Sequence, residues 1–97
     1  MKVEFSPEAL ADLEAIYAYI ARDKPDAALS WVEKLIDAAE RTSALPLLGR
    51  VVPEVGDAAI RETQVRNYRI IYRVEARRLL VLTVVERHRR LQLRGTR

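Results

Sequence analysis

Apolar side chains recur every three or four positions in the first half of the chain, which is the spacing of a helix with one buried face. The first stripe comprises Leu10, Leu13, Ile16, Tyr17 and Ile20. Ser6 and Pro7 precede it, and this pair is typical of a helix start because serine caps free amides and proline fits the first turn. The pattern predicts a helix that runs to about Arg22, preceded by a short strand over residues 2–5.

A second helical stripe follows after a very short break. Pro25 suits another helix start, and the stripe then passes through Ala28, Trp31, Val32, Leu35, Ala39 and Thr42. We expect this helix to end near Ser43, with Trp31 as an anchor in the core. Because the connection is so short, the two helices should form an antiparallel hairpin.

The second half of the chain has the two-residue period of strands. After a connector without a regular period, residues 59–65, 68–75 and 79–86 are predicted to be strands. Arg66 and Asn67 fit a two-residue turn, since asparagine tolerates the left-handed conformation that such turns need. We expect one α+β domain over residues 1–97: an N-terminal strand and an antiparallel helix hairpin packed on an antiparallel sheet, with a C-terminal three-stranded meander.

The last predicted strand is apolar on both faces. Residues 79–85 include one polar side chain, Thr83, so both faces of this strand need cover. The helix hairpin supplies one cover. The other has to come from the basic C-terminal tail, residues 87–94, or from a partner.

The middle strand of the meander separates two kinds of side chain. Tyr68, Ile70, Tyr72 and Val74 alternate with Arg69, Ile71 and Arg73. Successive side chains of a strand point to opposite faces, so one face should pack on the core while the other presents guanidinium groups to something outside. This arrangement favours a binding function.

Composition limits the class of protein. The 97 residues include no cysteine and one histidine, His88, which excludes disulfides and the usual zinc sites. No apolar run approaches the ~20 residues that span a membrane, and the N-terminus lacks the apolar core of a signal peptide. We therefore expect a small cytoplasmic protein without a metal or a cofactor.

Charge is unevenly distributed along the chain. Residues 1–45 carry nine acids and five bases, whereas residues 46–97 carry five acids and twelve bases, all of them arginine. Coding bias could explain the choice of arginine over lysine but not the crowding into one half. Guanidinium groups bind carboxylates and phosphates through paired hydrogen bonds, so the basic half should face an acidic partner or nucleic acid.

The basic half offers only part of a catalytic site. Its candidates are the arginines with His88, and Tyr68 and Tyr72 lie nearby in the sequence. Cleaving RNA without a metal needs a base, an acid and cations. His88 could fill one proton-transfer role, but the tyrosines fall on the apolar face and a second proton carrier is missing. These residues favour a binding protein over an enzyme and leave any catalytic residue unknown.

The order of these features resembles the RelE/ParE toxin superfamily, and most of all its ParE branch. The resemblance rests on Asp12-Leu13, Ile16-Tyr17, Tyr19-Ile20-Ala21, Pro25, Ala27-Ala28, Leu45-Pro46, Gly49-Arg50, Val65, residues 68–74, Val84-Val85 and Arg89-Arg90. It implies the toxin of a type II toxin–antitoxin system that arrests growth. In the ParE branch it implies binding and inhibition of DNA gyrase and neutralisation by a ParD-like antitoxin, with nucleic acid reached only through the antitoxin.

The resemblance also assigns roles to particular residues. Residues expected to bind the target or the antitoxin are Arg61, Arg66, Arg69, Arg73, Arg87, His88, Arg89 and Arg90. The antitoxin should also cover the apolar residues Leu80, Leu82 and Val84.

A RelE-like ribosome-dependent mRNA endonuclease is the alternative, and a chain that binds antitoxin without toxicity is a third. The endonuclease branch carries paired lysines where this chain has Ile60-Arg61-Glu62, and a tyrosine after the last strand that is missing here. The ParE-like ending is usually His-Gly-Arg-Arg, whereas here it is Arg87-His88-Arg89-Arg90, with the histidine displaced by one position.

Overall fold

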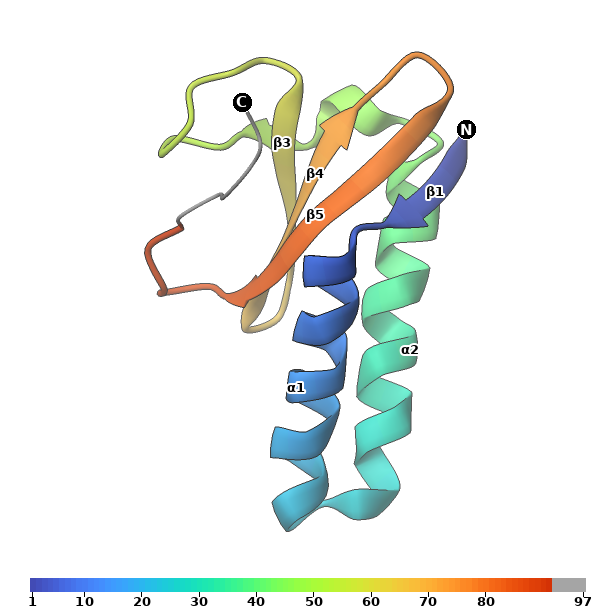
Figure 1. Cartoon of the computed structure of the whole chain (residues 1–97), viewed down its shortest axis with the longest axis vertical. Helices are drawn as coiled ribbons and strands as arrows, with labels where there is room; N and C mark the ends of the chain where they lie inside the picture. The colour runs from blue at the N-terminus through green and yellow to red at the C-terminus, as the bar shows by residue number, and fades with distance from the viewer. Residues whose placement is uncertain (92–97) are drawn as a thin grey trace.

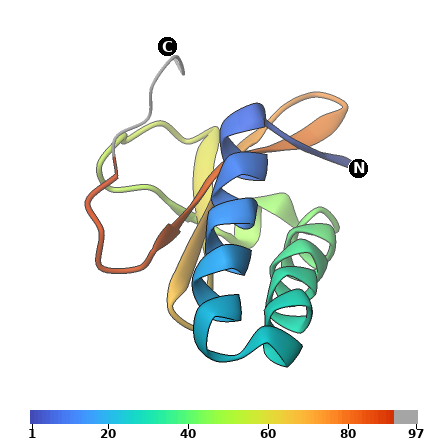
Figure 2. The same cartoon turned by 60° about the horizontal axis from the view of Figure 1, so that its bottom comes forward.

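The computed structural model describes residues 1–91, and Gln92–Arg94 of the predicted basic tail lie outside the described residues. Two helices, α1 (Pro7–Asp23) and α2 (Pro25–Thr42), form the predicted hairpin. Ser6 caps α1, because its hydroxyl oxygen accepts a hydrogen bond from the Ala9 amide at 3.0 Å. The helices lie side by side on one face of the sheet, and their far ends project beyond it (Figures 1 and 2). Within residues 1–91, neither helix is both long enough and apolar enough to span a membrane.

The sheet contains the three predicted meander strands and two further strands. They are β1 (Lys2–Phe5), β2 (Arg50–Val51), β3 (Ile60–Val65), β4 (Tyr68–Val74) and β5 (Arg78–Glu86), in the order β1-β5-β4-β3-β2. The predicted α+β fold and its antiparallel meander are confirmed, but β1 runs parallel to β5, which makes the sheet mixed. No short turn joins these two strands, and only a hairpin turn would have fixed their relative direction. β2 was not predicted, because a strand of two residues is too short to show an alternation. The connector before β2 contains a 3₁₀ turn (Pro46–Leu48).

The turn between β3 and β4 has the predicted two residues, since Val65 pairs with Tyr68 across it. The left-handed residue is Arg66, with a φ of 52°. The sequence had predicted this conformation for Asn67, because asparagine tolerates it. That prediction is wrong, because Arg66 adopts it instead.

A register shift interrupts the ladder between β4 and β5. Ile71 is paired with Thr83, but the next residue, Tyr72, is paired with Val81. Leu82 is therefore left without a partner of its own, which is the arrangement of a β-bulge. The bulge changes which residues of β5 face the helices.

This shift corrects the expectation for the apolar residues of β5. Leu80 and Leu82 pack into the cluster on the far side of the sheet, whereas Val84 packs into the cluster beneath the helices. Leu82 and Val84 are only 5% and 4% exposed. The three residues therefore do not form one exposed apolar surface. Their contact with an antitoxin stays a prediction that a shared exposed surface does not support.

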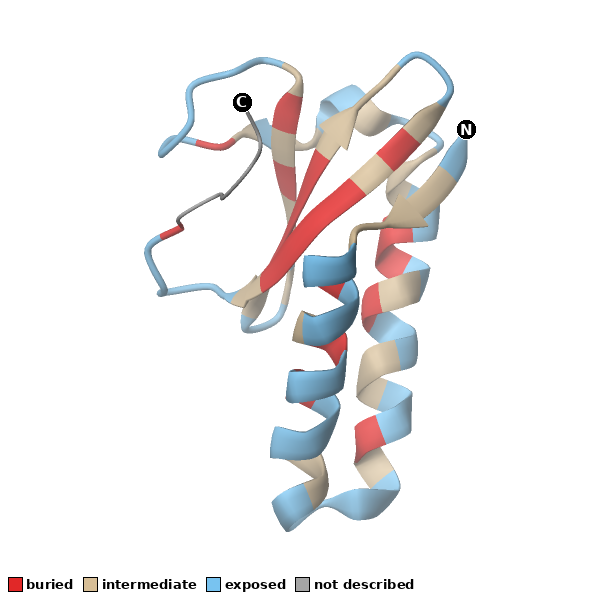
Figure 3. Ribbon diagram, viewed as in Figure 1, coloured by how far each residue is buried: buried red, intermediate tan, exposed pale blue. Residues whose placement is uncertain are grey.

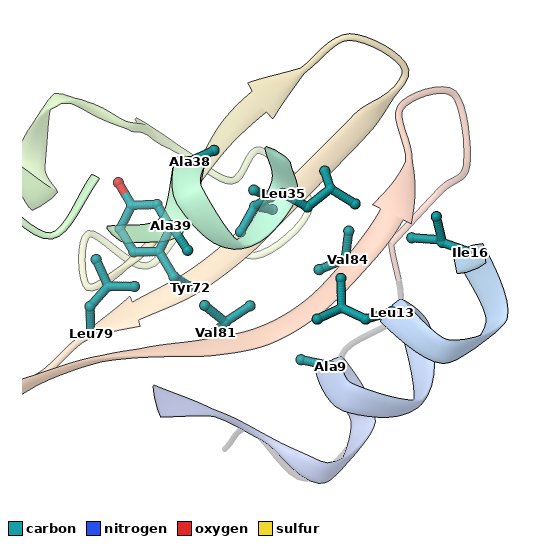
Figure 4. Packing of buried hydrophobic residues seen from close by; sticks show 11 residues of the cluster. Ala9, Leu13, Ile16, Leu35, Ala38, Ala39, Tyr72, Leu79, Val81 and Val84 are labelled. Carbon is teal, nitrogen blue, oxygen red and sulfur yellow. The ribbon is translucent and has the colours of Figure 1, made fainter. Parts of the chain in front are cut away.

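The main core lies between the helix hairpin and the sheet (Figures 3 and 4). Its buried members are Ala9, Leu13 and Ile16 of α1, Leu35, Ala38 and Ala39 of α2, and Ile70, Tyr72, Leu79, Val81 and Val84 of the sheet. Trp31, the predicted core anchor, is only partly buried and lies at the edge of this core, where it contacts Tyr68 edge-on at 6.1 Å between ring centroids.

A second, smaller core covers the opposite face of the sheet. It consists of Val52, Ile60, Ile71, Leu82 and Leu91. The connector before β3 and the segment after β5 thus supply the second cover that β5 needs. Of the two sources that the sequence left open, the chain's own C-terminal segment provides part of it, because Leu91 is 7% exposed.

Candidate binding site at the C-terminal segment

Arg69 of β4 is buried in a network of ion pairs. Its Nε donates to Glu62 Oε1 at 2.8 Å, and its Nη1 and Nη2 donate to the two carboxylate oxygens of Glu54, each at 2.9 Å. Arg69 is 6% exposed, so the expectation that its guanidinium faces outward is wrong. The two carboxylates offset the cost of removing this charge from water.

The charges of this network are stabilised by one another. The hydrogen bonds from Arg69 lower the pKa of Glu54 to about 2, against the opposing effect of burial. The hydrogen bonds with Glu54, followed by those with Glu62, raise the pKa of Arg69 above its ordinary value, although burial alone would lower it. Glu54 and Arg69 therefore both stay charged near neutral pH.

The same network fixes the backbone that follows β5. Arg69 Nη1 donates to the Arg89 carbonyl oxygen at 3.3 Å, and the Leu91 amide donates to Glu54 Oε2 at 3.1 Å. The Arg87 amide also donates to the Asn67 carbonyl oxygen at 2.6 Å. These contacts hold residues 87–91 beside the connector that carries Glu54; the two segments are seen together at the left of Figure 1.

An open depression of about 490 Å³ lies at this junction. It is lined by Arg50, Pro53, Glu54, Arg69, Arg87, His88, Arg89 and Arg90. Five of the eight predicted polar site residues thus come together here: Arg69, Arg87, His88, Arg89 and Arg90. We call this feature the arginine depression.

The other predicted arginines lie elsewhere and have structural contacts. Arg61 donates to the carbonyl oxygens of Leu47 and Gly49 at 3.1 and 2.9 Å. Arg66 stacks over the Trp31 ring at 5.4 Å, and Arg73 pairs with Glu75 at 2.8 Å. The predicted single arginine face is therefore divided among several places, and binding by these three residues stays a prediction.

The candidates for proton transfer are poorly arranged for that task. Tyr72 is fully buried, its hydroxyl donates to the Pro46 carbonyl oxygen at 2.6 Å, and burial raises its pKa. Burial also raises the pKa of Tyr68. The exposed His88 side chain accepts a hydrogen bond from Arg87 Nε at 3.1 Å.

Within residues 1–91, no group of three or more acidic or histidine side chains is arranged to hold a metal ion.

The comparison with family models decides the identity of the chain. The model described as the ParE toxin of the type II toxin–antitoxin system, parDE, matches residues 3–91. The chain belongs to the ParE toxin family. It is therefore a toxin of a type II toxin–antitoxin system, as the resemblance in the sequence implied.

Two solved structures share the fold of this ParE-family protein. The chromosomal ParDE toxin–antitoxin system from P. aeruginosa has a TM-score of 0.76 and 20% identity, covering 89% of this chain and 95% of that chain. The toxin–antitoxin complex RelBE2 from Mycobacterium tuberculosis has a TM-score of 0.59 and 22% identity, covering 91% of this chain and 92% of that chain. No curated protein matches the chain. At these identities the two structures establish the fold alone.

Sequence reasoning missed the acidic members of this ParE-family site. Glu62 was within reach, because Gln64 pairs with Arg69 across the hairpin and Glu62 is the next residue on the same face of β3. Arg50 and Glu62 also form an ion pair on this face. Glu54 could not be placed, since it lies in a connector without a regular period.

Proposed function

We propose that this ParE-family toxin acts by binding DNA gyrase in the bacterial cytoplasm and that a ParD-like antitoxin neutralises it. The observation that carries a binding mechanism is the state of Arg69. This guanidinium is 6% exposed and is already paired with Glu54 and Glu62. It is therefore not free to neutralise a phosphorane, which would be its task in a ribonuclease.

The arginine depression is our candidate surface for the contact with the complex of gyrase and DNA. Arg87, His88, Arg89 and Arg90 are all exposed there, and their backbone is fixed by the hydrogen bonds of Arg69 and Glu54. A fixed backbone lowers the entropy that has to be lost when the side chains bind a partner.

Labelling of newly made macromolecules in cells tests the proposal. The chain is induced alone in bacteria, and DNA and protein synthesis are pulse-labelled over the following minutes. Early loss of DNA synthesis with continuing translation is the expected result. The variant R87Q/R89Q/R90Q should lose this effect, whereas R22Q/K24Q/R77Q, which removes the same number of exposed positive charges away from the depression, should keep it.

The same experiment separates the alternative, an mRNA endonuclease that acts on ribosomes. The basic surface around His88 is the observation in its favour. Early loss of translation, with cleaved mRNA detected by primer extension, would establish the endonuclease and refute action at gyrase. The absence of any growth arrest would instead indicate a chain that has lost toxicity.

For the antitoxin we propose a groove on the helix side of the sheet. It has a volume of about 310 Å³, and its apolar lining includes Ile16, Tyr19, Tyr68, Val84 and Val85. The charged residues of the lining are Asp12, Glu86 and Arg89. Tyr19 is 67% exposed. The apolar side chains suit an amphipathic segment, which is the kind of segment expected of a ParD-like antitoxin, and an acid of that segment can pair with Arg89 if it lies away from Asp12 and Glu86.

The substitution Tyr19→Glu tests this groove. It places a negative charge where an acidic segment should bind and removes an aromatic contact, so the dissociation constant of the antitoxin complex should rise at least about tenfold. Tyr17→Glu is the matched control, because Tyr17 is also exposed on α1 but does not line the groove. Equal affinities of the two variants in a calorimetric titration would exclude the groove.

A further inference from the structure

We propose that the arginine depression binds the phosphodiester backbone of duplex DNA directly. The inference rests on the proposed action at gyrase, because the substrate of gyrase is duplex DNA. It extends that function, since the family resemblance had implied contact with nucleic acid only through the antitoxin.

The depression retains positive charge after its internal ion pairs are counted. Arg69 is matched by Glu54 and Glu62, and Arg50 shares Glu62 while its side chain remains 68% exposed. Within residues 1–91, no ion pair joins Arg87, Arg89 or Arg90 to a carboxylate, and all three are exposed.

The fold holds these like charges close together. Arg87, Arg89 and Arg90 lie within four consecutive positions and line one depression with Arg50. Hydrogen bonds to the backbone of residues 87, 89 and 91 keep the segment in place. Like charges held at short range repel each other, and a polyanion relieves that repulsion when it binds.

The lining favours phosphate over an acidic protein surface. All four of the exposed cations are arginine, whose planar fork matches two phosphate oxygens. Pro53 is the one apolar residue of the lining, whereas protein interfaces are anchored by buried aromatic or aliphatic side chains. Large exposed apolar residues of the described chain, such as Leu47, Leu48 and Tyr19, do not line this depression. Phosphate binding needs no such anchor, because it is dominated by charge.

Fluorescence anisotropy with a labelled 20-base-pair duplex tests the inference. The full-length toxin is used alone, without gyrase, at salt concentrations from 50 to 200 mM. If Arg50, Arg87, Arg89 and Arg90 each neutralise a phosphate, the logarithm of the association constant should fall against the logarithm of salt with a slope of about −3.6, so affinity should drop about 150-fold over this range.

Two variants with equal net charge locate the site. R87Q/R89Q/R90Q should reduce the slope to about −1, because one contact remains. R22Q/K24Q/R77Q loses three exposed positive charges elsewhere and should keep the wild-type slope. A similar loss in both variants would mean that net charge alone attracts DNA, and the inference would be wrong.

Other outcomes also overturn it. These are the absence of binding at 50 mM salt, tighter binding of a single-stranded RNA than of the duplex, and stronger displacement by an acidic peptide than by unlabelled DNA. Since the anisotropy assay contains no gyrase, a failure to bind DNA in it does not decide whether the toxin inhibits gyrase. The supercoiling assay decides that question. Conversely, DNA binding without inhibition of gyrase would refute the proposed target and leave the DNA site intact.

Discussion

The substitution Glu54→Gln should destabilise the protein, because Glu54 joins the connector, the sheet and the C-terminal segment. Its carboxylate accepts two hydrogen bonds from Arg69 and one from the Leu91 amide. A glutamine keeps the shape of the side chain but removes the charge that faces the buried guanidinium.

The size of the effect follows from the pKa of Glu54. A carboxyl with a pKa of about 2 in the folded state and an ordinary value of 4.5 contributes at most about 3 kcal/mol to folding. The side chain is 20% exposed, and glutamine can still accept hydrogen bonds. We therefore expect a loss of about 1–2 kcal/mol at pH 7.

The dependence on pH provides a second, independent signature. Because the folded pKa is lowered, the contribution of Glu54 is complete above pH 4.5 and is lost as the pH falls toward 2. Urea unfolding, followed through the fluorescence of Trp31, is measured for both proteins between pH 7 and pH 2.5. The difference in the free energy of unfolding should shrink over the acidic part of this range.

Glu14→Gln is the control, since Glu14 is exposed on α1, and it should change the free energy of unfolding by less than about 0.5 kcal/mol. If Glu54→Gln is as stable as the wild type at pH 7, with a parallel acid profile, the ion-pair network does not hold the C-terminal segment.

Three further substitutions test the fold around the site, each by urea unfolding. In Gly49→Ala, the new Cβ would overlap Tyr72 Oη and lie 2.7 Å from the Glu62 carbonyl oxygen, so a loss of about 1–3 kcal/mol is expected from overpacking; unchanged stability would contradict this tight approach. Asp12→Ala removes the acceptor of the Thr83 hydroxyl and of the Val84 amide, and leaving buried donors unpaired should cost about 1–3 kcal/mol, whereas a neutral result would mean that water reaches them. Arg66→Ala removes one of the two cations over the Trp31 ring and leaves Lys34 at 5.5 Å, and it should both shift the tryptophan emission and destabilise by about 0.5–1 kcal/mol; an unaltered spectrum would exclude the stacking of Arg66.

Local signals predicted most of the fold. The serine and proline residues that begin α1 and α2 act on the first turn of each helix, so the helix starts were predicted closely. The strands β3 and β4 followed from alternation over six and seven residues, and β5 followed from a continuous apolar run. The parallel pairing of β1 and the bulge at Leu82 depend on contacts between distant segments, and a local pattern carries no information about them.

The site was predicted only in part, for a related physical reason. Alternation showed that Arg69 lies on the opposite face of β4 from Tyr68 and Tyr72, which the structure confirms. It could not show that the connector folds back over that face and brings Glu54 to the guanidinium. The consecutive basic residues after β5 were correctly grouped, because neighbours in a short segment remain neighbours in space.

A supercoiling assay with purified DNA gyrase tests whether this toxin acts on gyrase. Relaxed plasmid, ATP and gyrase are incubated with increasing amounts of the toxin, of R87Q/R89Q/R90Q, or of R22Q/K24Q/R77Q. We expect the toxin and the control variant R22Q/K24Q/R77Q to inhibit supercoiling alike, whereas R87Q/R89Q/R90Q should not inhibit it. Supercoiling that continues unchanged at a molar excess of folded toxin would contradict the proposal that this ParE-family protein acts on gyrase.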